Sequence, residues 1–134
     1  MNTILKIIEK HGGLEALKTN GHLKIENPPY MALSIDYLGD GPHKQPMIAV
    51  AHNYEQNGDI MADPDMQLEI GPDINGELTL YPISYQNDGL GIAQSVYVIR
   101  NGQLIGYYSK LKKELSAFLK VWEKNLCQQG FLTA

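Results

Sequence analysis

Two Asn-Gly pairs, each set between runs of alternating apolar and polar residues, constrain the fold of this 134-residue chain most strongly. Asn57–Gly58 and Asn101–Gly102 are typical of two-residue type I′ turns, because Asn and Gly tolerate the positive φ angles that such turns need. Asn75–Gly76 gives a weaker signal, since the preceding Gly71 and Pro72 lengthen that loop. Short connections of this kind join antiparallel strands, whereas parallel pairing would need crossover helices that the middle of the chain lacks.

The strands are predicted from period-two alternation between these turn signals. From residue 31 to 37, apolar side chains alternate with Ala, Ser and Asp, which is the pattern of a strand with one buried face. Further strands are predicted at residues 22–26, 46–56, 59–70, 77–86, 92–100 and 103–108. We therefore expect an antiparallel meander sheet of six or seven strands.

Helical segments flank this strand-rich middle. Near the N-terminus, apolar residues of the stretch 4–8 are followed by a pause at Gly12–Gly13, and a second apolar stretch stops at Asn20–Gly21. The C-terminal segment, with Ser109 as a candidate cap, carries an apolar stripe at helical spacing, formed by Leu111, Leu115, Phe118, Leu119, Trp122 and Leu126. The prediction is a single α+β domain over residues 1–134, with an N-terminal helical pair and a long C-terminal helix packed on one face of the sheet.

Charge is distributed unevenly along the chain. The net charge is −4, but residues 26–99 hold eleven carboxylates and only one basic residue, Lys44. Nucleic-acid binding needs Lys and Arg side chains that displace counterions from phosphates, so no direct nucleic-acid binding is expected there.

The cysteine content and the hydropathy of the chain limit its location. The single cysteine, Cys127, excludes an intramolecular disulfide framework and a Cys-based zinc site, and predicts a reducing, cytoplasmic location. No stretch approaches the roughly 20 apolar residues of a membrane span, so we expect a soluble protein without a membrane partner.

The segment from His52 to Met66 is the most informative stretch for function. If Asn57–Gly58 form the two-residue turn, Gln56 lies opposite Asp59, Tyr54 opposite Met61, and His52 opposite Asp63; these partners share one face of the hairpin.

The same register predicts an irregularity further along the second strand. Continued unchanged, it would place Asp65 opposite Val50 on the apolar face and turn Met66 away from that face. One extra residue near Asp63, Pro64 and Asp65 restores the parity, so we predict a β-bulge there. Pro64 suits a bulge because proline cannot donate a ladder hydrogen bond.

His52 and Asp63 are the candidate catalytic residues, as a general acid and base or as part of a metal site with Asp59 or Glu55. The structural alternative is an ordinary cross-strand pair worth about 0.2 to 1 kcal/mol. Metal ligands must converge on one point, and Glu55 points to the opposite face from His52, so no metal site and no cofactor are predicted.

Other catalytic signatures are absent from the sequence. There is no phosphate-binding glycine loop, nucleophile elbow or zincin histidine pair. His11, His22 and His43 stand in turn-rich or polar surroundings and are expected at the surface.

Seven carboxylates and no Lys or Arg occur between Glu55 and Glu77, at a spacing that does not match an EF-hand. A solvated sheet face or a charged strand edge is one explanation. Our leading hypothesis is a non-enzymatic interaction or accessory domain that engages a basic or cationic partner, with binding residues Tyr54, Glu55, Gln56, Asp59, Asp63 and Asp65. The alternatives are a small metal-dependent or general acid/base hydrolase centred on His52 and Asp63, and an acidic anti-restriction or nucleic-acid-mimicking protein. An exposed edge strand could also support a homodimer.

Three parts of the sequence form a distinctive set. They are the residues His52, Tyr54, Glu55, Gln56, Asn57, Gly58, Asp59, Met61, Asp63, Pro64 and Met66, the stretch 7–13, and Pro29 with Tyr30. In these residues the sequence resembles an uncharacterised bacterial domain family, met in hypothetical proteins of gut anaerobes and associated with mobile elements. Asp65 stands where that family is expected to have Glu, which keeps the carboxylate. The resemblance spans most of the chain and implies a free-standing module of unknown function, with no activity to carry over.

Overall fold

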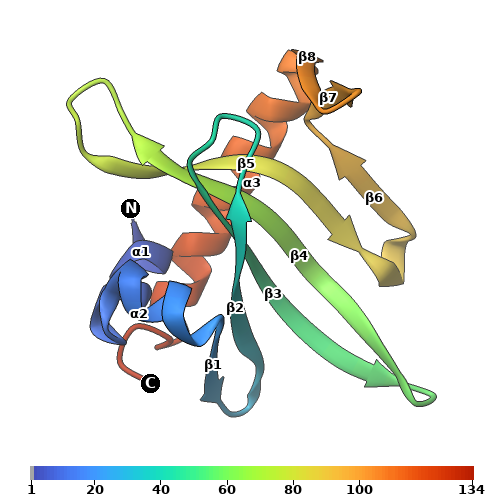
Figure 1. Cartoon of the computed structure of the whole chain (residues 1–134). Coiled ribbons are helices and arrows are strands. Elements are labelled where there is room, and N and C mark those ends of the chain that lie inside the picture. Colours follow the sequence, from blue (N-terminus) through green and yellow to red (C-terminus); the bar gives the residue numbers. More distant parts are fainter. Residues whose placement is uncertain (1) are drawn as a thin grey trace.

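Six antiparallel strands follow one another in chain order across the main sheet of the computed structural model, which describes residues 2–134 (Figure 1). This arrangement confirms the predicted meander. The strands are β1 (His22–Asn27), β2 (Tyr30–Asp40), β3 (Pro46–Gln56), β4 (Asp59–Pro72), β5 (Leu78–Asn87) and β6 (Ile92–Ser95).

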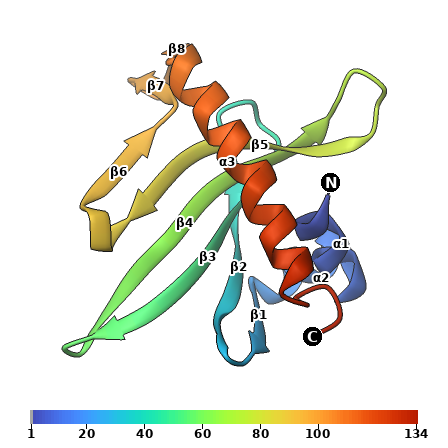
Figure 2. The same ribbon diagram turned by 180° about the vertical axis from the view of Figure 1, so that it is seen from behind.

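Three α-helices cover one face of this sheet. They are α1 (Thr3–Lys10), α2 (Gly13–Asn20) and α3 (Ser109–Gln128), and the short 3-10 helix η1 (Asp88–Leu90) follows β5. Figure 2 shows α3 running across the sheet, with α1 and α2 beside its C-terminal half. The buried side chains of all three helices join those of the sheet in one hydrophobic core, as the predicted packing requires. None of these helices, which lie within residues 2–134, has the length and apolar character needed to cross a bilayer.

The predicted strand at residues 92–100 is in fact two strands in different sheets. The chain leaves the main sheet at Val96, whose N–H donates to the Ile83 carbonyl and whose own carbonyl accepts from the Tyr108 N–H, both at 2.8 Å. After Val96, strand β7 (Tyr97–Arg100) pairs only with β8 (Gln103–Tyr107) in a separate hairpin. The buried Val96 side chain therefore marks the break, which the continuous alternation of the sequence did not predict.

The start of α3 also differs in detail from the prediction. Ser109 is the first helical residue, and Tyr108 occupies the N-cap position without a side-chain capping bond. The capping role predicted for Ser109 is therefore wrong, because the helix begins at Ser109 itself, one residue earlier than a cap at that position requires.

The β3–β4 hairpin has the predicted turn and register. Asn57 and Gly58 have φ angles of 52° and 86°. Gln56 pairs with Asp59, and Tyr54 pairs with Met61. These pairs fix which side chains of the hairpin share a face.

The predicted β-bulge is present in β4. Asn53 pairs with Ala62 and Ala51 with Asp65, so Asp63 and Pro64 together stand opposite the single residue His52. Past the bulge, buried side chains pair across the two strands, with Val50 opposite Met66 and Ile48 opposite Leu68. The extra residue therefore keeps the apolar side chains of β4 directed into the core.

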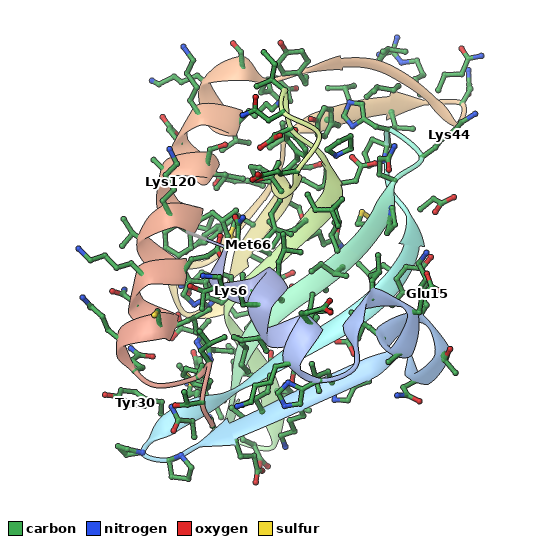
Figure 3. All side chains as sticks on the ribbon, turned by 90° about the vertical axis from the view of Figure 1, so that its left-hand side faces the viewer. Lys6, Glu15, Tyr30, Lys44, Met66 and Lys120 are labelled. Carbon is green, nitrogen blue, oxygen red and sulfur yellow. The ribbon has the colours of Figure 1, made fainter. Side chains whose placement is uncertain are left out.

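Charge separates between the two layers of the fold. The helices carry eight lysines and four glutamates, whereas the rest of the chain carries three basic and eleven acidic residues. In Figure 3, Met66 lies in the interior between the sheet and α3, and Lys120 lies on the outer side of α3. The helical layer is thus basic, and the sheet with its loops is acidic.

Candidate functional site

The outer part of the β3–β4 hairpin, residues 53–62, extends beyond the main sheet, and we call it the acidic arm. The last pair between β2 and β3 joins Leu33 to His52, and the last pair between β5 and β4 joins Gln86 to Asp65. Beyond those pairs the only strand partner of β3 is β4, and the arm projects away from α3 in both ribbon views (Figures 1 and 2).

The surface of the acidic arm combines negative charge with one large apolar side chain. Glu55 and Asp59 are exposed and the arm contains no Lys or Arg. Ile60, opposite Glu55, is 77% exposed. The arm therefore offers a small apolar contact beside the carboxylate of Glu55.

The base of the acidic arm is held by η1 and the end of β5. The Ala62 N–H donates to the Asp88 carboxylate at 2.7 Å, and the Gln86 amide donates to the same carboxylate at 2.7 Å. These bonds lower the pKa of Asp88. The Asn87 amide donates to Asp63 at 2.9 Å. The direction of the arm is thus fixed by hydrogen bonds at its base.

His52 lies under the C-terminal part of the chain and is only 8% exposed. Its ring centroid is 5.7 Å from that of Trp122 and 5.5 Å from that of Phe131. Its Nδ1 lies 3.2 Å from the carbonyl oxygen of Ala32, which can only accept, so Nδ1 carries the hydrogen.

Burial is the main influence on the protonation of His52. It lowers the pKa of the ring, and the backbone carbonyls nearby and the charge of Asp63 oppose the shift less strongly. The structure thus brings His52 and Asp63 near each other, but the ring bonds to Ala32 and the carboxylate bonds to Asn87. This geometry favours a packing role for His52 over catalysis.

The six predicted binding residues do not converge on one point. The register places Tyr54, Gln56 and Asp59 on the face of the hairpin that also holds His52, and Glu55 on the other face. Asp65 pairs with Ala51 and Gln86 on the sheet face that the helices leave uncovered. The candidates therefore form a two-sided surface.

Asp65 stands in an unfavourable electrostatic setting. Partial burial raises its pKa, and the charges of Asp36 and Asp88 raise it further. Despite this gathering of carboxylates, no group of three or more His, Cys, Asp or Glu side chains within residues 2–134 could hold a metal ion.

Sequence reasoning missed a pairing of His43 with Glu69 at the other end of the sheet. Glu69 is 1% exposed, and its Oε1 lies 2.8 Å from His43 Nδ1. Its Oε2 accepts from the backbone N–H groups of His43 at 2.8 Å and Gln45 at 3.2 Å. The β2–β3 loop is therefore folded around a buried carboxylate.

No signal in the sequence pointed to this pairing. The two residues are 26 positions apart, and Glu69 follows the alternation of β4 as an ordinary polar residue. The structure also shows why a glycine stands at position 41, since a Cβ atom there would lie 2.7 Å from the Glu69 carboxyl carbon.

Comparison with known protein families identifies one family that matches the chain. The family model described as "Domain of unknown function (DUF6908)" matches residues 2–132. The chain belongs to this family. No curated protein and no solved structure matches it. Membership of DUF6908 confirms the resemblance to a domain of unknown function over nearly the whole chain, and no activity is transferred with it.

Proposed function

We propose that this chain is a non-enzymatic interaction or accessory domain that engages a basic partner through its acidic arm. The observation that carries the proposal is the projection of residues 53–62 beyond the sheet, with both faces accessible and no basic side chain present. A protruding hairpin of this kind contributes little to the core, which is made by residues on the other side of the bulge.

Charge and shape together support a protein partner with Lys or Arg side chains. Complementary charge raises the rate of encounter and discriminates among partners, while affinity comes mainly from a few apolar or aromatic anchors. The exposed Ile60 supplies such an anchor, Glu55 supplies a negative charge on the same face of the arm, and Asp59 supplies one on the other face. The partly buried Asp65 adds a carboxylate at the foot of the arm.

The expectations about biological setting are part of the same proposal. They are a bacterial origin, a mobile element and the cytoplasm. Of these, only the cytoplasm has support from the chain, since a reducing compartment agrees with the free and partly buried Cys127. The main sheet has β1 and β6 at its edges, so a second copy of the chain is the alternative partner.

Capture experiments with two charge-matched double variants test the proposal. Glu55→Gln/Asp59→Asn removes two carboxylates from the arm, and Glu9→Gln/Glu77→Gln removes two exposed carboxylates elsewhere. We expect the first variant to lose the proteins captured by the wild type from a bacterial lysate, and the second to keep them.

The wild-type capture should also weaken as salt is added, because exposed charges are screened beyond roughly 10 Å at 0.1 M ionic strength. Identical captured proteins for the wild type and the arm variant would overturn the proposal. Capture of the chain itself, with a dimer seen by size exclusion, would replace the basic partner with a second copy.

A further inference from the structure

A cavity of about 240 Å³ lies at the end of the sheet opposite to the acidic arm. The β2–β3 loop, the far ends of β4 and β5, the start of β7 and the first turns of α3 surround it. The residues that matter for its chemistry are His43, Glu69, Gly71, Tyr81, Tyr97 and Lys112. The cavity shares no residue with the arm, so a ligand bound in it is independent of the basic partner proposed for the arm.

His43 and Glu69 form an oriented pair in this cavity. Because a carboxylate only accepts hydrogen bonds, the 2.8 Å contact between Glu69 Oε1 and His43 Nδ1 places the ring hydrogen on Nδ1. In the neutral ring, Nε2 is then a free acceptor. The side chain of His43 is 49% exposed, so its ring can be reached from the cavity that it lines.

The loop alone does not require this pairing. Glu69 Oε2 already accepts from the backbone N–H groups of His43 and Gln45, which accounts for the loop structure. Oε1 serves only the imidazole, and holding a half-exposed ring in one orientation costs rotamer freedom. Tyr97 also restrains the ring by an edge contact, with centroids 5.0 Å apart and planes at 81°. A histidine whose second nitrogen is fixed by a carboxylate is the arrangement that sites use to present the other nitrogen to a ligand.

The other residues that line the cavity indicate which chemical groups a ligand would have. The Tyr81 hydroxyl donates to the Pro72 carbonyl at 2.7 Å, so Tyr81 offers mainly its ring to the cavity. A Cβ atom at Gly71 would lie 3.5 Å from the Tyr81 ring, so the missing side chain leaves that ring uncovered. Lys112 has its Nζ 5.2 Å from the Tyr107 ring centroid, a cation–π contact that holds an ammonium at the rim.

We propose that this cavity binds a small hydroxylated aromatic carboxylate. Tyr81 and Tyr97 contact its ring, Lys112 pairs with its carboxylate, and His43 Nε2 accepts a hydrogen bond from its hydroxyl group. The volume is smaller than the roughly 300 to 1,000 Å³ typical of sites for drug-sized ligands, which limits the ligand to about one ring.

Titration of the full chain with 4-hydroxybenzoate, followed by two-dimensional amide NMR, tests the proposal. We expect saturable shifts at His43, Gly71 and Tyr97, with a dissociation constant on the order of 1 mM for so small a ligand. Benzoate lacks the hydroxyl group and phenol lacks the carboxylate, and each should bind about fivefold more weakly or worse.

Two variants and one matched control separate the contacts. Lys112→Gln should weaken 4-hydroxybenzoate about fivefold and leave phenol unchanged, whereas Lys120→Gln on the same helix should change neither. His43→Asn keeps a donor for Glu69 but removes Nε2, so it should weaken 4-hydroxybenzoate and phenol but not benzoate. Thermal unfolding of each variant confirms that it is folded.

Three results would overturn the proposal. The first is no saturable shift at about 10 mM 4-hydroxybenzoate, well above the millimolar range in which a fragment should bind. The second is an equal effect of Lys112→Gln and Lys120→Gln. The third is unchanged binding of 4-hydroxybenzoate by His43→Asn.

Discussion

Glu123 of α3 accepts a hydrogen bond of 2.9 Å from the backbone N–H of Ile4, which stands 119 residues earlier at the start of α1. The carboxylate is buried, and this burial raises its pKa, with the bond from Ile4 opposing the shift. An acidic side chain at a helix N-terminus satisfies N–H groups that have no partner within the helix. Glu123 thus joins the first and last helices of the chain.

Removing this bond should destabilise the fold. Glu123→Ala leaves the Ile4 N–H buried without an acceptor, and we expect the free energy of unfolding to fall by about 1 to 3 kcal/mol. Glu123→Gln keeps an acceptor oxygen and should lose less. Urea denaturation measures both, with Glu114→Ala, exposed on the same helix, as a control expected to change by less than about 0.5 kcal/mol. Equal losses for Glu123→Ala and Glu114→Ala would show that the bond contributes nothing.

His52 should make the stability depend on pH. Its pKa is lowered from 6.5 in the folded state, so the folded chain binds a proton less readily than the unfolded chain. The free energy that the neutral His52 ring contributes to folding is present above pH 6.5. It is lost as the pH falls from 6.5 through the lowered pKa of the folded state. His52→Phe keeps a ring between Trp122 and Phe131 and should remove this part of the dependence.

Two measurements check this prediction. NMR titration of the His52 ring should give a pKa below 6.5, and denaturation between pH 7 and pH 5 should show a smaller loss of stability for His52→Phe than for the wild type. A ring that titrates at or above 6.5 would contradict the prediction.

The β-bulge should be indispensable for the register of β4. Deleting Pro64 would move the residues after it by one position and turn Met66, Leu68 and Ile70 toward the uncovered face. We expect a loss of more than about 4 kcal/mol, or no cooperative unfolding transition at all. Inserting one glycine after Ile74, a fully exposed loop residue, is the control and should be tolerated. A deletion variant as stable as the insertion variant would show that the bulge does not set the register.

Asp65 should oppose folding at neutral pH. Its raised pKa means that its ionisation costs more in the folded chain than in the unfolded chain, so its contribution to stability is lost as pH rises through the raised value. Asp65→Asn should therefore increase the free energy of unfolding at pH 7, by up to about 1 kcal/mol. Asp59→Asn, exposed at the arm turn, is the matched control and should change it by less than about 0.5 kcal/mol. Equal effects of the two variants would refute the electrostatic explanation.

Much of the fold could be predicted because its determinants are local. Asn57–Gly58 specify a turn by their own backbone preferences, and the turn then fixes the register of both strands. The bulge could be predicted from the same register, because the apolar side chains of β4 face the core only if that strand contains one extra residue. The break at Val96 could not be predicted, because it depends on hydrogen bonds to Ile83 in β5 and to Tyr108 just before α3. Both residues are more than ten positions away in the sequence.

The candidate site was less accessible to sequence reasoning. The strand register predicted that His52 lies opposite the bulge. The burial of its ring comes from Trp122 and Phe131, and the hairpin sequence does not indicate that these residues pack against it. The pairing of His43 with Glu69 depends on how the β2–β3 loop folds back over β4. Contacts of that kind arise from tertiary structure and leave no periodic pattern.

The division of charge between the basic helices and the acidic sheet gives the molecule a permanent electric dipole, whose negative end lies on the side of the sheet. Such a dipole experiences a torque in the field of a charged object, so the chain would rotate before any contact forms. The chain would therefore turn its sheet toward a polycationic surface and its helices toward a polyanionic surface. The orientation would be selected during the approach itself.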